Sequence, residues 1–221
     1  CYTECRVVVP DVVALNTCIV CHSGRGNNEE ASTSSRFAGH HAPTAAILFA
    51  EFSHVAYEYP EQDYTPKSYF AHDGIGAGDI GPCVTCHMNG EEANHTFKVV
   101  EKDDAGVITA INADICVTCH NGEDALLVSE LEEVAAGYQE AGQLLVDLLN
   151  NANGLTNYTR AVIDNDNVLE NDRGAFQNAK LPSEDSGGFT HNRYYVKRAI
   201  FDAIDWAEDG AIDGEIADYA A

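Results

Sequence analysis

The sequence predicts a mainly irregular chain with several α-helices and one short β-hairpin, and three observations support this fold class. Residues 123–150 and 192–208 carry apolar side chains at helical spacing. Within 96–111, two short apolar runs flank a turn at 103–106, which is the pattern of a hairpin. Most of the remaining chain is rich in Gly, Pro, Asn and Asp, so regular structure is expected to be modest.

The helix expected over 123–150 is the clearest element in the chain. Its apolar residues approximate one stripe, which is Leu127, Leu131, Val134, Tyr138, Leu145 and Leu148. The other segments are expected, in chain order, to be an extended 1–17, a polar loop over 22–39, a short helix near 43–54 that begins at Pro43, irregular structure over 57–82, and a loop-rich stretch over 155–190.

The charge of the chain excludes several classes of partner. Its 221 residues include 36 acidic and 12 basic side chains, which gives a formal net charge of -24. Such a field repels nucleic acid and anionic membrane surfaces and favours cationic or metal-bearing partners. The longest apolar stretches, such as 44–50, are far too short to span a bilayer, so no transmembrane helix is expected.

Six of the eight cysteines form three copies of one pattern, C-x-x-C-H, which is the attachment signature of c-type haem. Two thiols at this spacing reach the two vinyl groups of one porphyrin, and the adjacent His is the proximal ligand of the iron. The sequence therefore predicts three haems c. The thioether cysteines are Cys18, Cys21, Cys83, Cys86, Cys116 and Cys119, and the proximal ligands are His22, His87 and His120.

Zinc and disulfides are the alternative interpretations of these cysteines. Zinc sites usually pair two C-x-x-C units, or one such unit with a downstream H-x(3-5)-H pair, and no such histidine pair is present. Cys1 and Cys5 belong to no motif, because no His follows them. We interpret them first as a disulfide, within the chain or to another subunit. A lipid-modified Cys1 and an unusual C-x-x-x-C haem attachment are the alternatives.

The second axial ligand of each iron separates electron carriers from catalysts. Met88 is the only methionine, and it directly follows a proximal His. Of the nine histidines, six remain after the three proximal ligands are assigned, so ligation by two histidines per iron is expected. The distal candidates are His40, His72, His95 and His191, with His41 and His54 ranked below them.

The reasons for this ranking lie in the local sequence. His40 precedes the helix expected at Pro43, His72 ends an aromatic segment before the second motif, and Asp73 could orient its ring. His95 opens an expected strand, and His191 begins the last helix. Four strong candidates for three irons leave one in surplus, either as a structural His or as a ligand to a haem in a neighbouring subunit.

The chain is expected to form a single haem-cored domain over 1–221. Residues 1–122 hold the three motifs, and the helical part 123–221 would pack on the haems or on a neighbouring subunit. Thioether and axial bonds would tie distant segments together, because each haem is a large apolar disc that replaces part of the core.

These motifs, with several further stretches, resemble the small multihaem c-type cytochromes of metal-reducing bacteria, including those that polymerise into extracellular cytochrome filaments. The resemblance implies a multihaem cytochrome fold built around stacked haems, two histidines per iron, export from the cytoplasm and long-range electron transfer. In filament-forming relatives a distal His can come from the adjacent subunit. Some of those subunits carry four or more haems, whereas three motifs are present here. The similar stretches are 18–24, 40–49, 81–88 with 95–97, and 191–206.

The sequence therefore predicts an electron carrier and not an enzyme. The alternative function is a multihaem reductase of nitrite, sulfite or a similar oxyanion, which needs an open iron site and cationic residues. Expected partners are other redox proteins, extracellular acceptors such as metal oxides, or further copies of the chain in an oligomer or filament. Because haem c is attached outside the cytoplasm, an extracellular or cell-surface protein is expected, with the periplasm as the alternative.

Overall fold

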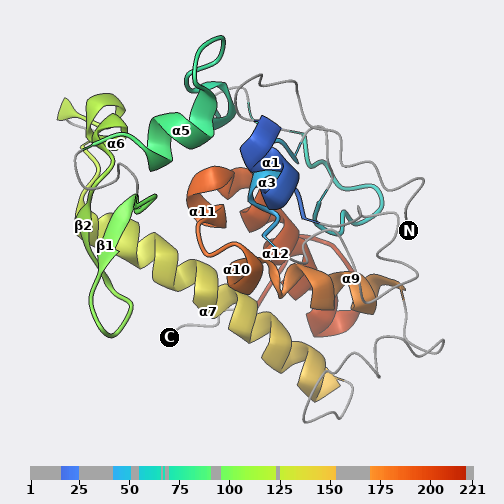
Figure 1. Ribbon diagram of the computed structural model, residues 1–221. Coiled ribbons are helices and arrows are strands. Elements are labelled where there is room, and N and C mark those ends of the chain that lie inside the picture. The colour runs from blue at the N-terminus through green and yellow to red at the C-terminus, as the bar shows by residue number, and fades with distance from the viewer. Residues whose placement is uncertain are drawn as a thin grey trace. The chain divides into compact units, whose positions relative to one another are not determined.

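The computed structural model describes residues 16–24, 42–50, 55–65, 67, 70–90, 96–122, 125–152 and 170–217. Within these ranges the chain is helical and irregular, with one two-stranded antiparallel sheet. This agrees with the expected fold class (Figure 1). The chain divides into two compact units. The first unit contains the described parts of 21–70 and 138–217, and the second contains 16–20 and the described parts of 71–137.

The second unit holds the hairpin and most of the motif residues. Strand β1 (Val100–Lys102) pairs antiparallel with β2 (Ile108–Ile111), and the register shifts between Glu101 and Lys102. The carboxylate of Asp103 fixes the turn by accepting the Ala105 and Val107 backbone N–H groups at 2.9 and 3.0 Å. The hairpin predicted from the sequence is thus confirmed, although its first strand is shorter than expected.

Helix α5 (Gly81–His87) packs against α6 (Asp114–Cys119) in this unit. The Asn89 side chain accepts the Ile115 N–H at 2.9 Å. Gly90 has a φ of +99°, and an added Cβ would collide with the Asn112 carbonyl, so only glycine fits this position. The end of α5 therefore lies directly against the segment that leads into α6.

The first unit is built around the long C-terminal helices. Its core contains a continuous cluster of buried apolar side chains, among them Ile47, Leu145, Leu181 and Ile200. Burial of such side chains is the main favourable contribution to folding. The helices that supply this cluster are α3 (Thr44–Leu48), the C-terminal part of α7 (Val128–Ala152), α9 (Glu170–Asn178), α10 (Leu181–Glu184), α11 (Gly188–His191) and α12 (Arg193–Asp209).

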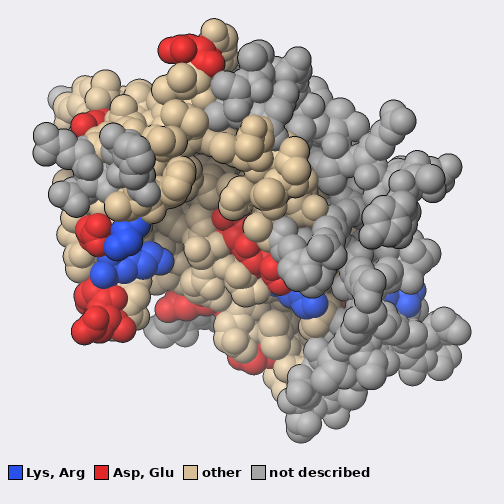
Figure 2. Space-filling model, viewed as in Figure 1, with Lys and Arg blue, Asp and Glu red and all other residues tan. Residues whose placement is uncertain are grey.

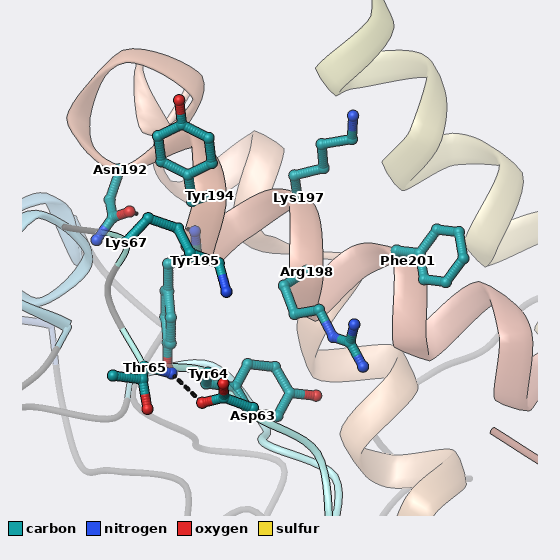
Figure 3. Close-up of a pocket in the computed structure, with 10 residues that line it drawn as sticks. All are labelled: Asp63, Tyr64, Thr65, Lys67, Asn192, Tyr194, Tyr195, Lys197, Arg198 and Phe201. Atoms are coloured by element: carbon teal, nitrogen blue, oxygen red, sulfur yellow. Dashed lines mark hydrogen bonds between the residues drawn. The ribbon is translucent and has the colours of Figure 1, made fainter. Parts of the chain in front are cut away.

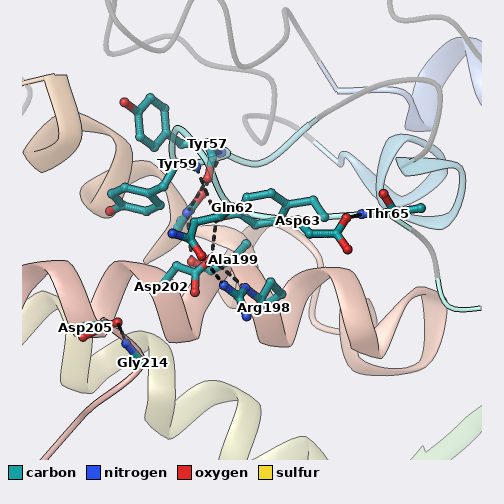
Figure 4. Close-up of polar contacts among 12 residues, drawn as sticks. Tyr57, Tyr59, Gln62, Asp63, Thr65, Arg198, Ala199, Asp202, Asp205 and Gly214 are labelled. Atoms are coloured by element: carbon teal, nitrogen blue, oxygen red, sulfur yellow. Dashed lines mark hydrogen bonds and ion pairs between the residues drawn. The ribbon is translucent and has the colours of Figure 1, made fainter. Parts of the chain in front are cut away.

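Buried polar side chains fix how these segments pack. The fully buried Asn178 amide accepts the Tyr57 N–H at 2.8 Å and donates to the Tyr57 and Ala199 carbonyls at 2.9 and 3.0 Å. Arg198 donates to the buried Asp202 carboxylate at 2.8 Å and also to Gln62 (Figure 4). The irregular segment over 55–65 is thereby joined to α9 and α12.

The last helix was predicted with the correct extent, but its first turn was not. Asn192 caps α12 by accepting the Tyr195 N–H at 3.2 Å, and Gly210 ends the helix in the left-handed conformation. His191 lies before this cap, at the end of the separate helix α11, and not in the first turn of the last helix. The loop-rich prediction for 155–190 is wrong over 170–190, where α9, α10 and α11 form.

The other helix predictions need smaller corrections. The helix expected near 43–54 is present as α3, with Pro43 immediately before it, and residues 51–54 lie outside the described ranges. The helix expected over 123–150 is α7, which begins at Val128 and continues through Ala152. Its apolar stripe is buried only in the C-terminal half, because Leu127 and Val134 are exposed. No described helix is long and apolar enough to cross a membrane.

Candidate haem sites

All three C-x-x-C-H motifs lie on short helices, namely α1 (Asn16–His22), α5 and α6. A spacing of three residues brings both thiols of a motif to neighbouring positions on one face of a helix. The third proximal ligand, His120, follows α6 as its C-cap, and its N–H donates to the Cys116 carbonyl at 2.7 Å. All six motif thiols are free, so each is available for a thioether bond.

Large apolar side chains are exposed beside these motifs. Val20 and Val117, which lie inside the first and third motifs, are 78% and 50% exposed, and Ile80 and Phe97 near the second motif are also exposed. Each of these side chains leaves apolar surface in water beside a motif. A porphyrin held by the motif thiols would cover such side chains, so the residues fit haem c.

Four of the six motif cysteines are partly buried, namely Cys18, Cys83, Cys86 and Cys116, whereas Cys21 and Cys119 are exposed. Burial raises the pKa of the Cys86 thiol to about 11, and the nearby Cys116, Cys83 and Cys119 add to this shift. Burial also raises the pKa of the Cys83 thiol, and the charge of Cys18 raises it further. Among the described residues no three His, Cys, Asp or Glu side chains converge on a metal position, so no zinc-type site is formed there.

The proximal ligand of the second motif is oriented by the backbone. His87 Nδ1 lies 3.0 Å from the carbonyl oxygen of Phe97, which accepts a hydrogen bond from the Nδ1–H group. This hydrogen bond places the proton on Nδ1 and leaves the lone pair of Nε2 for a metal. Phe97 has a φ of +59°, an uncommon conformation for a bulky residue. Backbone strain of this kind is often found at functional sites, and here it accompanies the carbonyl that orients His87.

His72 and His120 face each other in the second unit. Their ring centroids are 6.2 Å apart, and the ring planes are 86° apart. Two imidazoles bound to one metal ion would have centroids roughly 6.2 Å apart, because each nitrogen lies about 2 Å from the metal and about 1.1 Å from its own ring centre. The separation of these two rings therefore fits a shared iron that both would ligate.

The remaining candidates divide into described and undescribed residues. In the first unit, His191 Nδ1 lies 2.8 Å from a carboxylate oxygen of Asp185, a residue that the sequence analysis did not single out. The only local signal for Asp185 is the Gly187-Gly188 pair that follows it and admits a ring close to the backbone. The candidates outside the described residues are His40, His95, Cys1 and Cys5, together with His41 and His54.

A separate cavity of about 330 Å³ lies in the first unit between α12 and the segment over 63–67 (Figure 3). Lys67, Lys197 and Arg198 line it together with the aromatic rings of Tyr194 and Phe201. The cavity is lined by no cysteine and no histidine, so it lies apart from the haem ligands of the described chain.

Comparison with known proteins assigns the chain to a family. A family model described as outer membrane cytochrome MtrC/MtrF-like, domains II/IV, matches residues 8–151, which include all three motifs. The chain belongs to this family. The MtrC/MtrF-like assignment confirms the predicted multihaem c-type cytochrome of metal-reducing bacteria, and with it haem c as the cofactor.

Two relatives from Geobacter sulfurreducens extend the similarity over nearly the whole chain. The C-type polyheme cytochrome OmcB is 32% identical over 97% of this chain and 34% of its own length. The C-type polyheme cytochrome OmcC is 34% identical over 96% of this chain and 32% of its own length. The chain thus spans about a third of the length of these two relatives.

One solved structure is also similar, the undecaheme cytochrome from the S-layer of Carboxydothermus ferrireducens. It matches with a TM-score of 0.49 and 19% identity, over 86% of this chain and 27% of that one. This likeness is too distant to support conclusions about the present chain.

Proposed function

We propose that this chain transfers electrons through three haems c, each bound by two histidines. Haem c supplies an iron that accepts and releases single electrons. The residues of this chain attach it, ligate it and keep water and substrates from the iron. In this proposal the C-x-x-C-H motifs hold the three groups as the sequence predicts, and His72, His191, His40 and His95 are the distal candidates.

The facing pair of His72 and His120 is the observation that carries this proposal. The ring separation of 6.2 Å supports an iron shared by the two imidazoles, each of which would ligate it through one nitrogen. The oriented His87 adds a second ligand with a fixed tautomer. An iron with two histidine ligands is saturated, which favours electron transfer over the oxyanion reductase considered from the sequence.

The spacing of the motifs supports a chain of haems. The charge of Cys18 contributes to the raised pKa of Cys83, and the charge of Cys116 contributes to the raised pKa of Cys86, so each pair lies close together. Haems attached at these positions would be neighbours, because every thioether fixes one edge of a porphyrin at its cysteine. Short edge-to-edge distances favour fast electron tunnelling, so the arrangement suits a carrier more than isolated redox sites.

The expected partners follow from charge and family. Acidic patches outnumber basic ones on the face shown in Figure 2, in keeping with 36 acidic and 12 basic residues in the chain. A surface of this kind attracts cationic or metal-bearing partners. Together with the outer membrane family it supports a cell-surface role in which electrons pass to redox proteins or metal oxides. Association into an oligomer or filament stays a prediction, which electron micrographs of the purified protein would test.

A His72→Ala variant tests the proposal at its central observation. We expect one of the haems to change from low-spin to high-spin, because His120 would then be the only protein ligand of its iron. Electron paramagnetic resonance and absorption spectra of the oxidised protein measure this change. His54→Ala is the matched control, since the sequence around His54 has no ligand feature, and it should leave every haem low-spin.

Two results would contradict the proposal. The first is a His72→Ala protein with unchanged low-spin spectra, which would remove His72 from the iron. The second is a substantial high-spin signal in the unaltered protein, which would indicate an open iron site and favour the reductase.

A further inference from the structure

The pair formed by His191 and Asp185 differs from the other oriented histidine in the described chain. His87 donates to a neutral backbone carbonyl, whereas His191 Nδ1 lies 2.8 Å from a carboxylate. Asp185 is only 5% exposed, and hydrogen bonds to ionised acceptors are stronger than those to neutral ones. The two imidazoles would therefore differ in electron density.

The local backbone holds this carboxylate in place. Asp185 is the C-cap of α10, and its N–H donates to the Leu181 carbonyl at 2.8 Å. Its other carboxylate oxygen accepts the Gly187 N–H at 3.2 Å, and its carbonyl accepts the Gly188 N–H at 3.0 Å. Both oxygens of the carboxylate are thus engaged, one by the backbone and one by the ring.

The imidazole of His191 lies against Gly187, which has no side chain to displace the ring. A Cβ added at Gly187 would lie 2.8 Å from the ring carbon Cε1 and 3.3 Å from Nδ1. The φ of Gly187 is -96°, which any residue adopts, so space and not backbone conformation requires glycine here. The chain thus provides a fitted place for this ring.

The buried side chain of Tyr138 lies near this carboxylate. Tyr138 is buried, and a Cβ at Gly188 would lie 2.5 Å from its hydroxyl oxygen. Burial, and then the charge of Asp185, raises the pKa of Tyr138. Within the described chain, the Tyr138 hydroxyl has no hydrogen-bond partner. In a site with little water, the hydrogen bond between Asp185 and His191 is stronger than it would be at the surface.

We propose that Asp185 is a positioning residue that makes His191 a strong distal haem ligand and lowers the reduction potential of that haem. This inference rests on the proposed function, in which His191 is a ligand candidate. The Nδ1–H group donates to Asp185, and Nε2 presents its lone pair to the iron. The carboxylate pushes electron density into the ring, and a stronger donor stabilises ferric iron relative to ferrous iron.

Asp185→Asn in the complete haem-loaded protein tests this proposal, because the amide keeps the shape and removes the charge. We expect the midpoint potential of one haem to shift upward while the other haems keep theirs. Spectroelectrochemical titration measures the potentials, and electron paramagnetic resonance shows the ligand field of the same haem. Asp202→Asn removes a charge from another buried carboxylate of the first unit and should shift no haem selectively.

Gly187→Ala is a second variant that leaves the carboxylate intact. The added methyl group would displace the ring of His191, so the ligand-field signature of the same single haem should change. If Asp185→Asn fails to fold, this change alone supports the placement of the ring, and an unchanged signature contradicts it.

His191→Ala separates the failure of this inference from that of the proposed function. If His191→Ala leaves all haems low-spin, the inference is wrong, while the His72→Ala result still decides the proposed function. If His191→Ala produces one high-spin haem but Asp185→Asn shifts no potential, His191 is a ligand and the role of Asp185 is wrong. Equal shifts in Asp185→Asn and Asp202→Asn would also overturn it.

Discussion

The two compact units of this chain bury apolar side chains to very different degrees. Every residue of the large buried cluster lies in the first unit, where α7, α9 and α12 supply most of it. In the described part of the second unit, the buried apolar side chains are Ile19, Pro82, Ile108 and Ala113. That unit instead exposes two large apolar side chains inside its motifs, Val20 and Val117.

This difference indicates two sources of stability. The first unit has the interior of an ordinary globular protein, in which packing and buried hydrogen bonds suffice. The second unit carries most of the motif cysteines and exposes Val20 and Val117 beside them, so covalently bound haem would add apolar contacts to it. Binding free energy is then folding free energy, as for other cofactor-dependent domains.

Removing the haems is the strongest way to test this comparison. A variant with Ser at all six motif cysteines should lose the structure of the second unit and keep the first. Hydrogen exchange measured by mass spectrometry should show opening free energies of about 0 kcal/mol over 71–122, against several kcal/mol in α12. Full protection of the second unit without haem would contradict the comparison.

A core substitution in the first unit should have a smaller effect and leave the haems unchanged. Leu145 is fully buried in α7, and Leu145→Ala should lower the free energy of unfolding by about 2–5 kcal/mol. Val134→Ala on the exposed part of the same helix should cost about 0.5 kcal/mol or less. Denaturant unfolding measures both. A changed number of low-spin haems in Leu145→Ala would show that the first unit also maintains the haem ligands.

Alkaline pH should selectively lower the free energy of unfolding of the first unit. The contribution of a single tyrosine is expected to be smaller than the effects of the substitutions above. Burial, and then the charge of Glu170, raises the pKa of Tyr57 to about 12, so the fold favours its neutral phenol. Below pH 10, the ordinary pKa of tyrosine, ionisation of Tyr57 does not change the free energy of unfolding. Between pH 10 and 12 the unfolded chain releases its proton first, and the free energy of unfolding falls as pH rises.

Tyr57→Phe sharpens this test, because it removes one titrating group from the same position. The variant should lose stability less steeply between pH 10 and 12, as measured by urea unfolding at several pH values. Tyr59, Tyr64 and Tyr195 have raised pKa values as well, so a slope remains. Equal slopes in the two proteins would remove Tyr57 from this explanation.

Patterns that involve only neighbouring residues were predictable from the sequence. The C-x-x-C-H spacing predicted haem c, because two cysteines and a histidine at nearby positions are needed to attach and ligate it. The family match confirmed haem c. The hairpin followed from its turn, in which Asp103 accepts two backbone N–H groups of its own loop. The extent of α12 followed, to within one residue at each end, from its apolar spacing.

Features that depend on tertiary contacts were not predictable. The sequence Glu170–Asn178 is polar, yet α9 forms because Asn178 bonds to Tyr57 and Ala199, which lie far away in the chain. The pairing of His72 with His120 joins residues 48 positions apart, and nothing local to His72 indicates which iron it would face. Asp185 acts through a ring six residues later, across a turn that the sequence pattern did not reveal.

Gly90 also affects the expected rate of electron transfer between the second and third motifs. Because it lets the end of α5 lie against the Asn112 carbonyl, it sets how closely the second and third motifs approach. Electron tunnelling slows exponentially with distance, so one absent methyl group would determine how long an electron waits between two neighbouring haems. With haems attached to both motifs, a side chain at this position would move the motifs apart and slow electron transfer between them.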